Sequence, residues 1–216
     1  YARRHDYGYK LYLYNETYKG ACWHPVRGPL LAQWCKIAAI RMSFEDHPQA
    51  ETIVWLDTDV SIKGMLTRVE TYMETQPVLR YENVSEPDRN YKCPVEEPPQ
   101  GRGKISVWAS RNGHWTKFEG KCGPNSGIMI FRRSDFTRQL LDGWWEIAMG
   151  DVPGPYDQGY IVQMYVKYPR HVAVFQEDAM TNARQNYLVH KCGKCAWLPN
   201  RTKLFLSHYG ENITVG

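Results

Sequence analysis

The chain has 216 residues, 43% of them hydrophobic and 13% aromatic, which favours one folded domain with a substantial core and excludes a disordered chain. Its net charge of +4 comes from 27 basic and 23 acidic residues without any basic block, so we expect no nucleic-acid partner. No apolar run is long enough to cross a membrane, so the chain is either soluble or the trimmed luminal part of a protein whose membrane anchor is missing here.

Apolar residues alternate between helix-like and strand-like spacing along the chain. The spacing predicts a helix that ends near residue 10 and helices at 29–44, 65–76, 134–149 and 157–167. It predicts strands at 10–14, 53–56, 78–81, 104–110, 127–132, 171–176 and 204–209. Residues 83–103, rich in Pro, Glu, Asn and Gly, are expected to form a surface loop. Because helices and strands alternate, the predicted fold class is α/β, with a single Rossmann-like, mostly parallel sheet flanked by helices.

Residues 53–62, IVWLDTDVSI, form an apolar run that ends in two aspartates one residue apart. Strand side chains alternate between faces, so Asp57 and Asp59 point the same way and repel each other unless a cation lies between them. The run is apolar on both faces, as in a buried parallel strand, and such sheets bind ligands at their carboxyl edge. The pattern favours a divalent metal site, although a turn in which either aspartate accepts from nearby backbone amides fits the same residues.

Three other segments carry candidate site residues, each with a structural alternative. Asn-Ser-Gly at 125–127 precedes a predicted strand and fits a plain turn equally well. Asp-Gln-Gly at 157–159 opens a predicted helix, where the aspartate suits an N-cap. Lys36 and Arg41 lie on the helix before the two aspartates, and charges on one helix face usually only face water.

Cysteines and glycosylation sequons indicate an oxidising compartment. The six cysteines form an even set, and we expect three structural disulfides. A redox or zinc-binding role for Cys192-Gly-Lys-Cys195 is the alternative, although a second CxxC is absent. The four sequons begin at Asn15, Asn83, Asn200 and Asn212.

Taken in order, the acidic pair, NSG and DQG resemble the motifs of GT-A glycosyltransferases, specifically the retaining family of yeast and fungal α-galactosyl- and α-mannosyltransferases and plant xyloglucan xylosyltransferases. The segment QWCKIAAIRMSFEDHPQAETIVWLDTDVSI is similar to that family's tryptophan-lysine helix and DxD strand. NSGIMIFRRSDFTRQLLDGWW is similar to its Asn-x-Gly strand and following helix, and PYDQGYIVQMY to its Asp-Gln helix. The resemblance implies one GT-A catalytic domain over residues 1–216, lacking its first strand and any N-terminal membrane anchor.

The resemblance also implies a Mn²⁺ or Mg²⁺ ion that stabilises the departing nucleotide diphosphate. Its ligands would be Asp57, Asp59 and His208, with Asp57 also facing the nucleotide ribose. The family's histidine is followed by an aromatic residue, one further residue and glycine, whereas the sequence after His208 reads Tyr-Gly, one residue shorter. A histidine after an apolar strand is otherwise often a packed or surface residue.

The remaining implied roles concern the donor and the acceptor. Gln158 and Asp157 would lie beside the anomeric carbon of the donor, where the Gln158 amide oxygen stabilises an oxocarbenium-like state and Asp157 binds sugar hydroxyls. Retention by attack from one face and retention by a covalent double displacement both stay open. The residues implied to contact the donor phosphates, the donor sugar or the acceptor are Lys36, Asn125, Ser126 and Gly127.

The implied activity is retaining, metal-dependent transfer of a hexose or pentose from a UDP- or GDP-sugar to a glycan or glycoprotein acceptor, in the secretory pathway and specifically the Golgi lumen. Two other classes fit part of the pattern. Haloacid dehalogenase-type phosphatases also place Asp-x-Asp after an apolar strand, with Asp57 as nucleophile and Asp59 as acid/base, but they expect this motif near the chain start. The other class is a non-catalytic carbohydrate-binding module whose Tyr and Trp residues stack on sugars.

Overall fold

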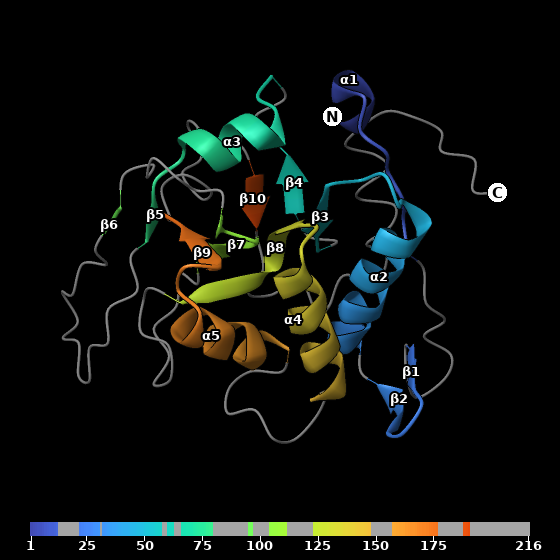
Figure 1. Ribbon diagram of the computed structural model, residues 1–216. Coiled ribbons are helices and arrows are strands. Elements are labelled where there is room, and N and C mark those ends of the chain that lie inside the picture. Colours follow the sequence, from blue (N-terminus) through green and yellow to red (C-terminus); the bar gives the residue numbers. More distant parts are fainter. Residues whose placement is uncertain are drawn as a thin grey trace.

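A computed structural model describes residues 1–12, 22–30, 32–57, 60–62, 66–79, 95–96, 104–111, 123–147, 157–176 and 188–190 of the chain. These residues build a six-stranded sheet with the order β3-β8-β7-β9-β5-β6 (Figure 1). Its strands are β3 (Thr52–Leu56), β5 (Val78–Leu79), β6 (Val95–Glu96), β7 (Val107–Arg111), β8 (Pro124–Arg132) and β9 (Val172–Phe175).

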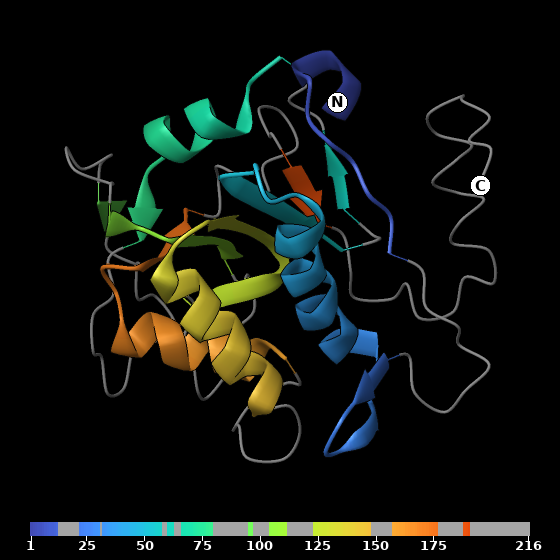
Figure 2. The ribbon, with the colours of Figure 1, turned by 45° about the vertical axis from the view of Figure 1, so that its right-hand side comes forward.

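Helices cover both faces of this sheet. In both views α4 and α5 lie on one side of the central strands and α3 on the other, while α2 runs beside β3 (Figures 1 and 2). A short helix, α1, lies near α3 (Figure 1), and the Tyr1 hydroxyl just before α1 donates to the Thr67 carbonyl, two residues before α3, at 2.7 Å. The helices are α1 (Ala2–His5), α2 (Ala32–Asp46), α3 (Val69–Thr75), α4 (Asp135–Glu146) and α5 (Gln158–Lys167).

The sheet is mixed, so the expectation of a mostly parallel sheet is wrong. Among the described strands only β7 and β9 pair in parallel, and the other pairings in the sheet are antiparallel. The strands are apolar on both faces because helices cover both faces of the sheet. Such burial occurs with parallel or antiparallel strands, so the apolar runs do not indicate strand direction.

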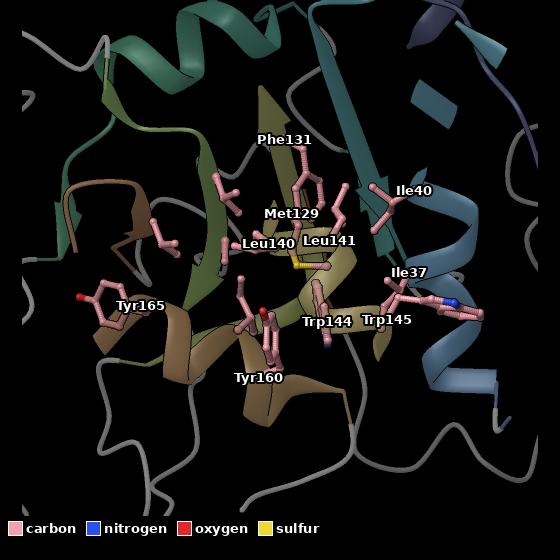
Figure 3. Packing of buried hydrophobic residues seen from close by; sticks show 14 of the residues in the cluster. Ile37, Ile40, Met129, Phe131, Leu140, Leu141, Trp144, Trp145, Tyr160 and Tyr165 are labelled. Atoms are coloured by element: carbon pink, nitrogen blue, oxygen red, sulfur yellow. The ribbon is translucent and has the colours of Figure 1, made fainter. Parts of the chain in front are cut away.

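Alternate residues of the central strands pack against opposite layers, as the two-residue repeat of a strand requires. On one face, Met129 and Phe131 of β8 pack against α2, α4 and α5 (Figure 3). On the other face, Trp108 of β7 and Ile130 of β8 join the core beneath α3. The buried faces of α2, α4 and α5 are therefore fixed against one side of the sheet.

Two smaller units flank the sheet. A hairpin of β1 (Cys22–His24) and β2 (Gly28–Leu30) precedes α2 and is tied to that helix by the disulfide Cys22–Cys35. The buried ring of His24 packs against Trp145 at 5.0 Å between centroids, so the hairpin also contacts α4. The second unit is an antiparallel pair of β4 (Val60–Ile62) and β10 (Leu188–His190).

The end of β3 meets the start of β8 at one edge of the sheet. Because the two strands are antiparallel, Leu56 pairs with Ile128, and the Asp57 amide donates to the Gly127 carbonyl at 2.8 Å. The α5 helix begins near the same end of β8, because its first residue, Gln158, contacts Asn125 of that strand.

A bulge in β8 shapes this edge. On β7 the pairing partner moves from Met129, opposite Ala109, to Asn125, opposite Ser110. The β8 residues between these two positions are therefore released from the ladder with β7, and bulges often re-aim groups near functional sites. Ser126 and Gly127 lie in the released stretch.

Several expectations concern residues outside the described ranges. The four sequons, the last predicted strand and the cysteines other than Cys22 and Cys35 are among them, so one of the three expected disulfides is described. Within the expected surface loop at 83–103, Val95–Glu96 form the short strand β6. The strand expected at 10–14 is not present in its described part, residues 10–12. Each described helix is too short or too polar to span a bilayer.

Candidate functional site

Lys36 lies at the centre of the polar groups that meet at this sheet edge. It belongs to α2, where its neighbours Cys35 and Ile37 are also buried, and only 6% of its surface is exposed. The expectation that Lys36 simply faces water is therefore wrong. Arg41, five residues further along the helix, is partly exposed and pairs with Asp142 of α4 at 3.1 Å.

The Lys36 ammonium is held by oxygens from three separate segments. Its Nζ lies 3.2 and 3.3 Å from the two carboxylate oxygens of Asp57, which follows β3, and 3.0 Å from Oδ2 of Asp157, which precedes α5. It also donates to the carbonyl and the hydroxyl of Ser126 in the β8 bulge, at 3.2 and 3.4 Å. One lysine thus joins the ends of β3, β8 and α5.

The charges around Lys36 favour its protonated form. Burial alone would lower the pKa of Lys36, but the nearby carboxylates of Asp157 and Asp57 outweigh it, and the pKa is raised above its ordinary value. Two carboxylates around one ammonium leave a single net negative charge at this point. Buried charges require such pairing because desolvation is otherwise too costly.

Asp57 is oriented by side chains from two directions. Besides the contacts to Lys36, its Oδ1 accepts from the Trp55 indole Nε1 at 2.7 Å. Trp55 lies two residues earlier, so it leaves the strand on the same side as Asp57. The Asp57 backbone carbonyl accepts from the Val60 amide at 3.0 Å. The carboxylate contacts described for Asp57 are thus to side chains, and the side chain remains 30% exposed.

Asp157 occupies the N-cap position of α5 but its side chain does not cap the helix. The carboxylate, with only 7% of the side chain exposed, is directed to Lys36 instead. Its backbone carbonyl accepts from the Trp144 indole of α4 at 3.0 Å. The interpretation of Asp157 as a mere cap is therefore wrong.

Asn125 and Gln158 form a second contact between β8 and α5. The Asn125 Oδ1 accepts from the Gly127 amide at 2.8 Å, which fixes which end of the Asn125 side chain is the carbonyl. Its Nδ2 then faces Gln158 and donates to Oε1 at 3.3 Å. The alternative of a plain turn before the strand is therefore wrong, because residues 125–127 lie within β8, and Asn125 combines a local bond to Gly127 with a contact to Gln158 of α5.

A divalent cation at this edge would need oxygen or nitrogen ligands beyond Asp57. Asp57 fits such a role, because its carboxylate is partly exposed and oxygen is the donor that Mn²⁺ and Mg²⁺ prefer. Asp59 and His208, the other two expected ligands, lie outside the described residues. Within the described ranges, no cluster of three or more His, Cys, Asp or Glu side chains is arranged to hold a metal.

The sequence of the chain matches the galactosyl transferase GMA12/MNN10 family over residues 1–203. The chain belongs to this family. Its membership confirms the resemblance drawn from the three motifs, and it overturns the phosphatase alternative, since that group shares only the Asp-x-Asp pattern. The described motif residues of the family member lie together at one sheet edge.

Curated relatives show which proteins the family member is similar to. It is 26% identical to the probable alpha-1,6-mannosyltransferase MNN10 of Saccharomyces cerevisiae, over all of this chain and 51% of that protein. It is 24% identical to an alpha-1,2-galactosyltransferase of Schizosaccharomyces pombe, over 81% of this chain and 45% of that protein. Galactomannan galactosyltransferase 1 of Cyamopsis tetragonoloba is 23% identical over 91% of this chain and 36% of its own length. The chain thus spans about half or less of these relatives.

A solved structure supports the fold class. A glycosyltransferase involved in the glycosylation of the major capsid of PBCV-1 superposes with a TM-score of 0.55, covering 97% of this chain and 87% of that one. The sequence identity is 16%, so the likeness concerns the fold. It confirms the predicted α/β, GT-A-like class, with the mixed sheet described above.

Proposed function

We propose that the chain carries the catalytic site of a retaining, metal-dependent glycosyltransferase that moves a hexose or pentose from a UDP- or GDP-sugar to a glycan or glycoprotein acceptor. The observation that carries the proposal is the bridging position of Lys36, which joins Asp57 to Ser126 of NSG and Asp157 of DQG at one sheet edge. The relatives' names support it, because they are mannosyl- and galactosyltransferases.

We assign Asp57, Asp59 and His208 as the ligands of a Mn²⁺ or Mg²⁺ ion. When bound, such an ion supplies stabilisation of the negative charge that develops on a departing diphosphate. Asp57 suits this role because Trp55 and Lys36 hold its carboxylate while leaving it partly exposed. The single negative charge of the Lys36 cluster, increased by Asp59, provides a site whose charge complements a divalent cation.

In this proposal Lys36 acts by holding carboxylates. Its ammonium is enclosed by protein oxygens, so it fixes Asp157 relative to Asp57 and thereby the donor-sugar side of the site relative to the metal side. Asn125, Ser126 and Gly127 line the edge between these two sides, where donor or acceptor hydroxyls are bound.

Gln158 lies beside the anomeric carbon in the proposed site. The Gln158 amide oxygen accepts from Asn125, which keeps this oxygen on the side of α5 that faces β8. In the proposed site the same oxygen stabilises the positive charge that develops on the donor sugar. A double displacement would need a carboxylate nucleophile, but Asp157 is buried and paired with Lys36, which lowers its reactivity. We therefore propose same-face attack. With an α-configured donor, retention would give the alpha linkages that two relatives' names print.

We place the protein in the secretory pathway, in the Golgi lumen. The disulfide between Cys22 and Cys35 supports this placement, because such bonds persist in oxidising compartments. The proposed acceptors, glycans and glycoproteins, are present in the Golgi lumen.

The test is a screen of UDP- and GDP-sugars with and without Mn²⁺, comparing the native chain with Asp59→Ala. We expect metal-dependent transfer or donor hydrolysis by the native chain and a loss of about 10³-fold or more in the variant. Equal turnover by the native chain and Asp59→Ala would contradict the assignment of Asp59 as a metal ligand. No turnover of any donor, with or without the metal, would instead favour the non-catalytic carbohydrate-binding alternative.

A further inference from the structure

The start of α5 carries two residues of the proposed site, and the adjacent helix α4 holds it by a side chain. Trp144 of α4 is fully buried, and its indole Nε1 donates to the Asp157 carbonyl oxygen at 3.0 Å. An indole N–H is a donor only, so this bond is directional. The Asp157 backbone is thus fixed by α4 while its carboxylate is fixed by Lys36 of α2.

The neighbouring Gly143 lets the two helices come close. A Cβ at Gly143 would lie 2.4 Å from the Tyr160 hydroxyl oxygen of α5, which is nearer than atoms can approach. The Tyr160 ring stacks on Trp144 at 5.9 Å with an interplanar angle of 19° (Figure 3). Glycine inside a helix is unfavourable relative to alanine, so its position here is explained by packing.

A second buried tryptophan shows that the Trp144 bond is no automatic result of burial. Trp108 of β7 is also fully buried, yet its Nε1 finds no acceptor among the described residues. Both indoles fill the core, but only that of Trp144 contacts the backbone of a proposed site residue.

We propose that Trp144 is a positioning residue, which holds the start of α5 where Asp157 reaches Lys36 and Gln158 reaches Asn125. The inference rests on the proposed function, because the groups being positioned are those assigned to sugar transfer. A displaced helix start would leave donor binding by the metal side intact and misalign the groups beside the anomeric carbon. Misplacements of about 1 Å cost up to about a hundredfold in rate.

The first experiment compares Trp144→Phe with the matched control Trp108→Phe in the full chain. Both changes trade a buried indole for a smaller ring, but only the first removes a hydrogen bond to Asp157. We expect kcat to fall about ten- to hundredfold in Trp144→Phe with the donor KM within about twofold, and both to stay near native in Trp108→Phe. Equal kcat losses in the two variants, or a loss confined to KM, would overturn the inference.

Hydrogen exchange gives a readout that needs no activity. In Trp144→Phe the amides of residues 161–165, whose i−4 acceptors are the carbonyls of residues 157–161, should exchange faster, while those of α2 keep the native rate, because only the start of α5 loses its link. Native exchange in both helices overturns the positioning role. If no nucleotide sugar is turned over by the native chain, the proposed function fails, and this measurement still decides whether Trp144 holds α5.

A rescue experiment guards against general damage to the fold. Gly143→Ala should lower kcat, because the added methyl group collides with the Tyr160 hydroxyl and moves α5. Adding Tyr160→Phe removes that oxygen and leaves Cζ at 3.5 Å, an ordinary contact, so the double variant should regain kcat to within about threefold of Tyr160→Phe alone. A double variant as impaired as Gly143→Ala would contradict the proposal.

Discussion

The starts of α4 and α5 look alike in the sequence and differ in the structure. Ser134 at the start of α4 accepts a hydrogen bond from the Thr137 amide at 3.0 Å, so its side chain caps the helix. Asp157 occupies the same position on α5, but its carboxylate pairs with Lys36 and leaves the helix uncapped by its own residue. Serine and aspartate are equally good caps, so the difference arises from tertiary contacts.

This difference shows how a helix start can serve stability in one place and the site in another. The cap of α4 serves the attachment of that helix to the sheet, because the Thr137 hydroxyl that Ser134 contacts donates to the Arg132 carbonyl of β8. At α5 the stabilisation that a cap would provide is replaced by contacts from α2 and α4, which also fix Asp157 in space. Substitutions at the two starts should therefore have different consequences.

The largest effect is expected when the carboxylates of Asp57 and Asp157 lose the lysine that they share. Lys36→Met leaves two carboxylates without a shared counter-ion, and breaking a buried pair costs about 3–5 kcal/mol of the free energy of unfolding. Urea denaturation measures it. The matched control is Lys10→Met, because Lys10 also pairs with an aspartate, Asp46, but at the surface. A loss in the control as large as in Lys36→Met would contradict the importance of burial.

Asp157→Asn tests the cap directly. Asparagine caps a helix as well as aspartate, so a residue that only capped would tolerate the change. We expect instead a loss of about 2–3 kcal/mol, because Lys36 keeps only one carboxylate, together with a kcat at least about tenfold lower. Thermal unfolding and initial rates with the active donor measure both quantities. If Asp157→Asn were as stable as the native chain, Asp157 would contribute no more than a helix cap.

Ser134→Ala should lower the free energy of unfolding by about 1 kcal/mol through the lost cap and leave kcat and KM unchanged. Ser134→Asn is the control, since it retains a capping oxygen and should restore stability. A change in kcat for Ser134→Ala at temperatures where the variant is folded would show that the start of α4 also serves the site.

The smallest expected effect is a pH dependence. The pKa of Lys36 is raised by Asp157 and Asp57 despite burial, so the native state binds its proton more tightly than the unfolded chain. The stability from Lys36 should be complete below its ordinary pKa of 10.5 and decline as the pH rises through the raised value. The stability difference between the native chain and Lys36→Met should therefore shrink above that pH. A difference that grows with pH would reverse the sign and refute the assignment.

Some of the site could be predicted because local patterns decide it. The apolar run before Asp57 produced β3, and the order of the three motifs indicated which residues meet. The β8 strand begins at Pro124, earlier than expected, because Asn-Ser-Gly looks like a turn and in fact lies in a strand with a bulge. Bulges depend on the partner strand, which a local pattern does not contain.

The burial of Lys36 could not be derived from helix periodicity, because α2 is not amphipathic at that point. The sheet, α4 and the disulfide-linked hairpin surround this part of the helix, and Trp34 to Ile37 are all buried. A single charge inside the apolar run AQWCKIAAI was the available signal. Such a charge has to meet partners inside the protein.

Trp55 and Trp144 each donate a hydrogen bond to a site residue, although the motifs in the sequence single out neither of them. For Trp55 the two-residue spacing from Asp57 on a strand was a usable signal. For Trp144 the contact joins residues on different helices, and the angle between helices is set by packing across the whole core. Sequence spacing alone does not define that angle.

The covalent link between Cys22 and Cys35 has a practical consequence for obtaining the protein. Cys35 directly precedes Lys36, so correct oxidation during biosynthesis and assembly of the charged cluster concern the same helical turn. Recombinant material from a reducing bacterial cytoplasm would lack this tether beside its central lysine. Enzyme assays therefore require protein secreted from a yeast or insect host, or refolded with a glutathione redox couple before purification.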